Sequence, residues 1–212
     1  MKIKFLKNLI KRHNRNTTPN LVSGFTIVEA LVAIFILTLS VAAMLGVTAS
    51  SISSARYANN EITANYLLQE AIDSVRSSRD TIAFQKRDDG AGYGWAGFLN
   101  KYGYPNSRCF SSNGCDVDMK NFGGDNITTN DIVSCSSSGC DPLYYYNDST
   151  SSIFYSHDTN LGNASVFKRT IKMQQTDSTN PDQIKIIATV DWTNGTLNKS
   201  QSLTVYLLNW QK

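Results

Sequence analysis

The sequence predicts an α+β fold in which a long N-terminal helix packs on a C-terminal antiparallel sheet. Residues 53–79 contain no Gly and no Pro, and their apolar side chains recur at the spacing of one helix face. Residues 184–192 instead alternate between apolar and polar side chains, and the hairpin signal Asn194-Gly195 follows them. Because each element has one apolar side, we expect these two sides to pack together.

The helix is expected to span residues 25–79 and to have two different halves. Between Ala30 and Ala49 the sequence carries no charge, and these 20 residues match the length that a helix needs to cross a bilayer. We therefore predict a membrane-spanning segment at 25–49 and an amphipathic segment at 53–79. The apolar face of the amphipathic segment consists of Ala64, Leu67, Leu68, Ala71, Ile72 and Val75.

Charge is unevenly distributed along the 212 residues. Residues 1–24 hold six of the 20 basic residues and none of the 17 acids, so the remainder carries a net charge of −3. A basic flank stays in the cytoplasm, and we expect the chain after residue 50 outside the membrane. A mildly acidic remainder argues against a nucleic-acid partner. The composition also excludes a disordered acidic chain, a collagen and a multi-pass membrane protein.

Residues 80–212 are expected to form an α+β head. A short helix that ends at Gly103 is predicted near its start, and the stretch 103–165, rich in Gly, Ser, Asn and Asp, predicts surface loops. The helical spacing is formed by Trp95, Phe98, Leu99 and Tyr102.

The predicted sheet covers residues 166–210 and has at least three strands. They are expected at 166–174, at 184–192 and, after the hairpin, at 202–210. Ile187 is the one apolar residue on the polar side of the middle strand. We therefore expect the second face of the sheet to be partly covered.

Four cysteines form two close pairs in similar Ser-rich turns. Cys109 and Cys115 are six residues apart, and Cys135 and Cys140 are five residues apart. An exported domain permits disulfides, so we expect two local ones, each stabilising the fold by roughly 2 kcal/mol. Crossed pairing and a four-thiolate zinc site remain open, although the spacing is looser than in usual zinc sites.

The junction between leader and apolar segment reads Gly24-Phe25-Thr26-Ile27-Val28-Glu29. A basic leader ending in Gly, then Phe, then a Glu at the fifth position of an apolar run resembles the type IV prepilin signal, which the pseudopilins of type II secretion share. The resemblance covers about residues 1–50. It implies that the membrane-bound prepilin peptidase cuts after Gly24, that residues 1–24 are a leader, and that Phe25 becomes an N-terminus, often methylated.

The same resemblance implies a structural role as the precursor of a filament subunit. Helices of neighbouring pilin or pseudopilin subunits bundle into a filament core, and Glu29 pairs with the amine of Phe25 on a neighbour. Before assembly such a chain lies in the lipid of the inner membrane, with its N-terminus in the cytoplasm and its head outside. After assembly it belongs to a cell-surface pilus or a periplasmic pseudopilus.

A second resemblance concerns residues 64–80 and a C-terminal pattern of V-x-W and L-x-x-Y-L-x-N-W. Both are similar to minor pilins of the PilV type and to the minor pseudopilin I. This similarity implies a minor subunit that primes or caps filament assembly. The C-terminal positions are Val190, Trp192, Leu203, Tyr206, Leu207, Asn209 and Trp210.

Electrostatics also singles out Glu29. A lone carboxylate near a membrane costs on the order of 3 kcal/mol on insertion scales, so it needs a cation, and the new N-terminal amine is the one this helix supplies. Alternatively, the Glu29 side chain merely extends to the membrane–water interface at the end of the helix and needs no cation. An ordinary signal peptide cut after Ala49, or an uncut anchor, would also explain the apolar run.

The sequence favours neither an enzyme nor a cofactor or metal site. His13 lies in the leader, so His157 is the one histidine of the mature chain, and we expect it in a surface loop with Asp158. Asp116 and Asp118 are expected to be solvated loop acids rather than calcium ligands.

The alternative function is a membrane-tethered adhesin or a ligand- or DNA-binding module. Loop aromatics could stack on sugars or bases, but we expect them to pack the loops onto the sheet. They are Tyr93, Trp95, Tyr102, Tyr104, Tyr144, Tyr145 and Tyr146. We expect a basic cluster on the sheet to be a solvated face. It consists of Lys168, Arg169, Lys172 and Lys185.

Overall fold

The computed structural model forms two compact units, Met1–Ser51 and Ile52–Lys212. The residues it describes are 24–84, 94–118, 131–147, 153–161, 163–177 and 180–210. The predicted leader therefore lies outside the described residues, except for Gly24.

Helix α1 (Ile27–Phe84) begins directly after Thr26. The Thr26 Oγ1 accepts a hydrogen bond of 3.2 Å from the backbone N–H of Glu29, which satisfies one of the donors that a helix start leaves unpaired. The helix continues five residues beyond the predicted end at residue 79. This extension buries Ile82 and Ala83, whose apolar side chains the predicted helix left out.

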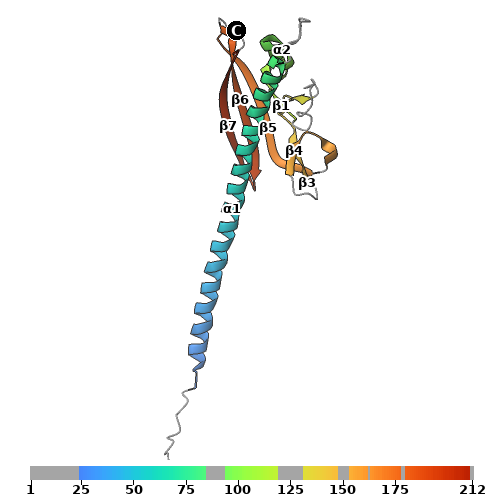
Figure 1. The fold of residues 1–212 in the computed structure, drawn as a ribbon. Helices are drawn as coiled ribbons and strands as arrows, with labels where there is room; N and C mark the ends of the chain where they lie inside the picture. The colour runs from blue at the N-terminus through green and yellow to red at the C-terminus, as the bar shows by residue number, and fades with distance from the viewer. Residues whose placement is uncertain are drawn as a thin grey trace, which may run out of the picture. The chain divides into compact units, whose positions relative to one another are not determined.

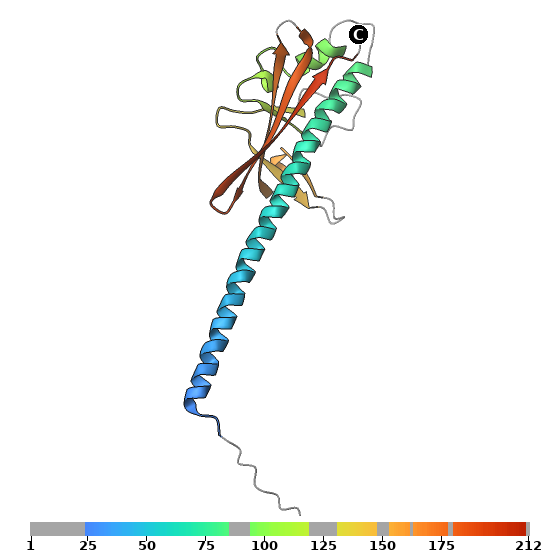
Figure 2. The same cartoon turned by 90° about the vertical axis from the view of Figure 1, so that its left-hand side faces the viewer.

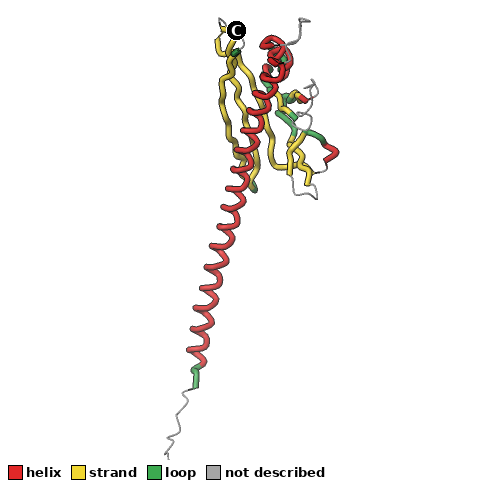
Figure 3. Tube along the Cα trace, viewed as in Figure 1, coloured by secondary structure: helices red, strands yellow, loops and turns green. Residues whose placement is uncertain are grey.

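Within the described part of the second unit, seven strands form one antiparallel sheet, and helix α1 lies along one side of it (Figure 1). Figure 2, turned by 90°, shows the helix and the long strands as two layers, and Figure 3 shows them by type. The α+β prediction is therefore confirmed. The strands are β1 (Cys115–Val117), β2 (Ile132–Ser134), β3 (Pro142–Asn147), β4 (Ile153–Ser156), β5 (Asn163–Asp177), β6 (Asn180–Asn194) and β7 (Leu197–Leu208).

Strand β5 organises the sheet because it has neighbours on both edges. One edge pairs with β6, which pairs in turn with β7. The other edge pairs with β1 at Ile171 and with β3 between Asn163 and Lys168. The three long strands were predicted, but β1 to β4 lie in the stretch 103–165 that was predicted as loops. These short strands are held by pairing with a distant partner, which local sequence preferences do not reveal.

The β6–β7 hairpin turns one residue later than its sequence signal indicates. Asn194 still pairs with Leu197, so the two turn residues are Gly195 and Thr196. Gly195 has a φ of +62°, while Thr196 is not among the residues with positive φ. This pattern is that of a type II′ turn, which has glycine at its first central position.

The core lies between the predicted apolar face of α1 and the inner face of the long strands. Ala64, Ala71 and Val75 on the helix are fully buried. The alternating strand is also confirmed, and Ile187 on its other face is half-buried. The inward residues of the sheet are Phe167, Ile171, Met173, Ile184, Ile186, Ala188, Val190, Trp192 and Leu207.

A short helix and two disulfides complete the head. Helix α2 (Gly94–Lys101) lies where it was predicted, and the chain leaves it through Gly103 at a φ of +88°. Disulfides join Cys109 to Cys115 and Cys135 to Cys140. The local pairing is therefore the one adopted, and the crossed pairing and the zinc site are not.

Two glycines test how closely the first disulfide loop packs on β5. At Gly114, with a φ of +78°, an added Cβ would lie 2.8 Å from the carbonyl oxygen of Ile171, whereas nothing lies within 4 Å at Gly139, with a φ of +98°. Gly139→Ala should lower the free energy of unfolding by about 1 kcal/mol through backbone strain alone. Gly114→Ala should lower it by about 3 kcal/mol because the clash adds to the strain. Urea unfolding of the oxidised proteins measures both, and equal losses would contradict the close packing.

Candidate functional site

The helical residues of the first unit expose apolar side chains all round. Every residue from Leu31 to Ser51 is exposed. Among the described residues, α1 is the one helix long and apolar enough to cross a membrane by length and composition. A helix that is apolar on all sides needs lipid or other protein around it. The segment is therefore compatible with a single-pass membrane anchor.

Glu29 stands at the start of this apolar segment, close in sequence to Gly24 and Phe25. Phe25 is 75% exposed, and Glu29 is exposed in the first turn of α1. Glu29 is also the only charged residue between Arg15 and Arg56. Within the described part of the chain, no cation pairs with its carboxylate. The helix dipole favours a negative charge at this position and supplies part of the compensation.

A second candidate site is a buried ion cluster around Arg169 of β5. The guanidinium donates from Nε to Asp116 Oδ1 at 2.7 Å and from Nη1 to Glu70 Oε2 at 2.9 Å. It also donates from Nη2 to the carbonyl oxygen of Val117 at 2.7 Å. Arg169 is 1% exposed and Asp116 is fully buried. The cluster joins α1, β1 and β5 through charged hydrogen bonds.

His157 extends the cluster from the loop that follows β4, as predicted, but the prediction of a surface side chain is wrong. Its Nε2 lies 2.6 Å from Asp116 Oδ2, and its side chain is 7% exposed. Asp118 accepts hydrogen bonds from Ser156 Oγ at 2.9 Å and from the His157 backbone N–H at 3.3 Å. The end of β4 thus packs against the end of β1. For the same reason Asp116 and Asp118 are not simply solvated loop acids.

Arg169 also overturns the predicted basic cluster on the sheet. Along β5 it lies on the inward side with Phe167, Ile171 and Met173, whereas Lys168 is exposed on the other side. The two-residue period of a strand already places Arg169 among apolar residues. That signal was present in the sequence. Its acidic partners are distant along the chain, so the sequence did not show that they contact Arg169.

Burial and charge oppose each other within the cluster. Burial raises the pKa of Glu70, and the charge of Arg169 lowers it, with a net rise. Burial alone would lower the pKa of Arg169, but Asp116 and Glu70 raise it, again with a net rise. Arg169 therefore stays charged, and Glu70 is a weaker acid than an exposed glutamate.

The hydrogen bonds of the cluster hold three elements of the head together. Among the described residues, no three His, Cys, Asp or Glu side chains are placed to hold a metal ion.

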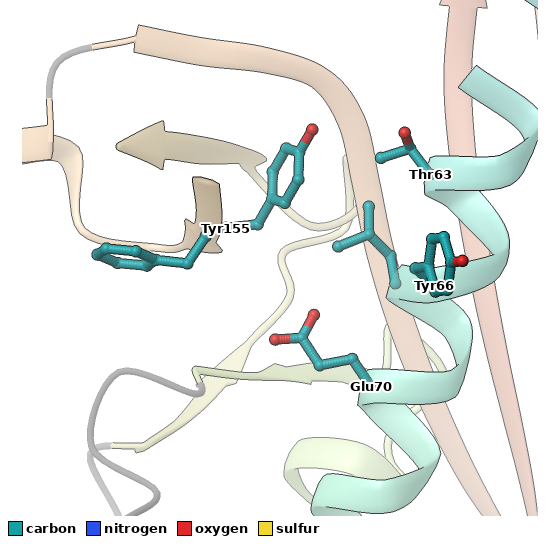
Figure 4. A pocket seen from close by; sticks show the side chains of 6 residues that line it. Thr63, Tyr66, Glu70 and Tyr155 are labelled. Carbon is teal, nitrogen blue, oxygen red and sulfur yellow. The ribbon is translucent and has the colours of Figure 1, made fainter. Parts of the chain in front are cut away.

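An open cavity of about 460 Å³ lies beside the cluster, between α1 and β4. Figure 4 shows the Glu70 carboxylate and the Tyr155 ring extending into it from opposite sides, with Thr63 next to them. Tyr66 on its rim is 67% exposed and Phe154 is 39% exposed. Sequence reasoning missed this cavity because it singled out neither Tyr66 nor Phe154. The lining is formed by Thr63, Tyr66, Leu67, Glu70, Phe154 and Tyr155.

The aromatics that the sequence did single out mainly pack the head. The ring centroid of Phe98 lies 4.9 Å from that of fully buried Tyr102 and 5.4 Å from that of Trp95. Tyr104 donates a hydrogen bond of 2.8 Å from its hydroxyl to Gln175 Oε1. The packing interpretation is confirmed for these residues, whereas Tyr93 lies outside the described part of the chain.

Comparisons of the chain with protein-family models, curated proteins and solved structures found no match. The assignment of a function therefore depends on the chemistry of the apolar helix, the ion cluster and the cavity.

The ion cluster predicts a large difference between two aspartates. Asp116→Asn removes the fully buried partner of Arg169 and should lower the free energy of unfolding by about 3 kcal/mol, because a buried charge loses its compensation. Asp73→Asn removes a 72% exposed carboxylate whose Oδ1 lies 3.5 Å from Arg76 Nη1. This change should alter the free energy of unfolding by less than about 0.5 kcal/mol. Chemical unfolding of both variants checks this. Similar losses would mean that the cluster does not hold the head together.

Proposed function

We propose that this chain is the precursor of a structural subunit of a type IV pilus or a related pseudopilus. The observation that carries the proposal is Glu29, a single carboxylate in the first turn of a helix followed by 20 uncharged residues. It stands in the sequence Gly24-Phe25-Thr26-Ile27-Val28-Glu29, which resembles the prepilin signal. The exposure of the apolar residues after it supports the proposal, because such a surface needs other helices or lipid around it.

The proposed mechanism begins with removal of the basic leader by the prepilin peptidase. Cleavage after Gly24 leaves an amine on Phe25, one residue before the helix cap Thr26. In lipid, and later in a bundle of apolar helices, this amine is the cation that the Glu29 carboxylate of a neighbour lacks. An ion pair is much stronger there than in water, and an unmatched charge is costly. The pair would therefore set the register between adjacent subunits.

In this proposal the membrane holds the subunit until it is assembled. The basic residues of the leader keep the N-terminus in the cytoplasm, and the head lies outside the inner membrane. The similarity of residues 64–80 and of the C-terminal strand to minor pilins favours a subunit that primes or caps the filament. The partners are then the prepilin peptidase, inner-membrane lipid and other pilin or pseudopilin subunits, without nucleic acid.

The alternative proposal is a membrane-tethered adhesin or another recognition module. The open aromatic cavity between α1 and β4 favours it, because exposed aromatic side chains around a cavity are typical of binding sites. The two proposals differ at the N-terminus. A filament subunit requires the cut after Gly24, whereas a tethered module can remain uncut.

Processing gives the first test. The chain produced with a prepilin peptidase in membranes should begin at Phe25, as measured by intact mass and terminal sequencing. Gly24→Arg should abolish the cut, and it should leave the fold intact because nothing lies within 4 Å of a Cβ added at Gly24. Gly46→Ala, which is equally unhindered, should be processed normally. A mature chain that begins at Ser50 or Met1 would overturn the proposal.

Assembly gives the second test. In cells with a complete filament system, Glu29→Gln should be processed but should enter sheared filaments at least about tenfold less than the wild type, because the buried amine loses its partner. The matched control is Glu61→Gln, on the same helix beyond the uncharged run, which should assemble normally. Immunoblots of filament and membrane fractions measure the ratio. Normal assembly of Glu29→Gln would contradict the assigned role.

A further inference from the structure

The cavity between α1 and β4 has the composition of a cation site. Three of its six lining residues are aromatic, and Glu70 contributes the one carboxylate. Thr63 and Leu67 complete the lining. Aromatic faces attract cations through the negative charge of their π-systems, and they do so best where water is partly excluded. An anion would meet the Glu70 carboxylate and no lining cation.

The surrounding cluster adds to this preference. Its described members are three acids, Glu70, Asp116 and Asp118, against one guanidinium, Arg169, and one imidazole, His157. The acids outnumber the cations whether His157 is protonated or neutral. Of the two acids that bind Arg169, Asp116 is fully buried, whereas 31% of the Glu70 side chain is exposed. Glu70 is therefore the acid of the cluster that a ligand in the cavity can reach.

The lining also gives the site its shape. In Figure 4 the Tyr155 ring extends from β4 toward Thr63, and the Glu70 carboxylate lies below it on the same side of α1. The ring of Tyr155 packs perpendicular to that of Phe167, with the ring centroids 5.9 Å apart. A cation that enters the cavity thus meets an aromatic face positioned by the core and a carboxylate positioned by Arg169. About 460 Å³ is enough for a small organic cation or a single side chain.

We propose that this cavity binds an organic ammonium group, held by the Glu70 carboxylate and the aromatic side chains of Tyr66, Phe154 and Tyr155. The ammonium is that of a choline headgroup, because the three aromatic side chains of the lining favour a quaternary ammonium. The site does not depend on the proposed filament function, because nothing in it involves the residues before Ile52.

The test is a titration of the full-length chain, in maltoside micelles, with choline and with its uncharged carbon analogue 3,3-dimethylbutan-1-ol. The two probes have the same shape, so their difference measures the contribution of the charge. Saturation-transfer NMR should give a saturable choline signal and at least about tenfold weaker binding of the alcohol. Equal binding of the two would overturn the proposal, because the cavity would then be merely apolar.

Variants locate the site. Tyr155→Phe keeps an aromatic face and should bind choline normally, whereas Tyr155→Leu should bind it about fivefold more weakly. Glu70→Gln should also weaken binding. Tyr206→Leu, which removes a 51% exposed aromatic from β7, is the matched control and should bind normally. If Tyr155→Leu and Glu70→Gln, each verified as folded by its thermal transition, both bind like the wild type, the proposal is wrong.

A third probe, Nα-acetyl-lysine methylamide, tests the assignment to a choline headgroup. Choline should bind more tightly than this probe. Tighter binding of the lysine probe would overturn the assignment and would indicate a lysine of a protein partner. Failure of both charged probes to bind more tightly than the alcohol refutes the site. Neither outcome alters the test of processing at Gly24, so the two proposals can fail separately.

Discussion

The second unit depends on the compensation of one buried charge, the guanidinium of Arg169. A fully buried arginine is tolerated only where acceptors surround it, and here they come from Asp116, Glu70 and the carbonyl of Val117. The requirement fixes β1 beside β5 and sets the rotation of α1 about its axis. A buried ion pair adds little net stability compared with an apolar core. We therefore infer that the ion cluster selects one packing of α1, β1 and β5 over other possible packings.

Helix α1 satisfies two different constraints along its length. From Leu31 to Ser51 its residues are exposed and uncharged, and local hydrogen bonding alone accounts for the helix there. From Ala64 to Val75 one face is buried in the core and carries Glu70 beside it. The first stretch is compatible with a membrane anchor, and the second is part of a folded head. The change occurs without a Pro to interrupt the helix.

Local patterns predicted most of the fold, and long-range contacts explain what they missed. The helix face, the alternation around Val190 and the short helix before Gly103 follow from periods of 3.6 and 2 residues. The strands at Cys115 and Ile132 do not, because three residues carry no period. The burial of the His157 side chain was missed for a related reason, since a polar residue in a polar stretch indicates an exposed side chain unless its partner is known. The role of Glu29 remains a prediction.

The disulfides have a consequence for the order of events during biosynthesis. Each closes a loop within a separation of six or five residues, so its two thiols meet by local chain motion alone. They need neither β6 nor β7, which complete the sheet and come last in the chain. In an oxidising compartment both bridges can therefore form before the C-terminal hairpin has emerged. The first bridge then holds β1 in place before β5, which pairs with it, has folded.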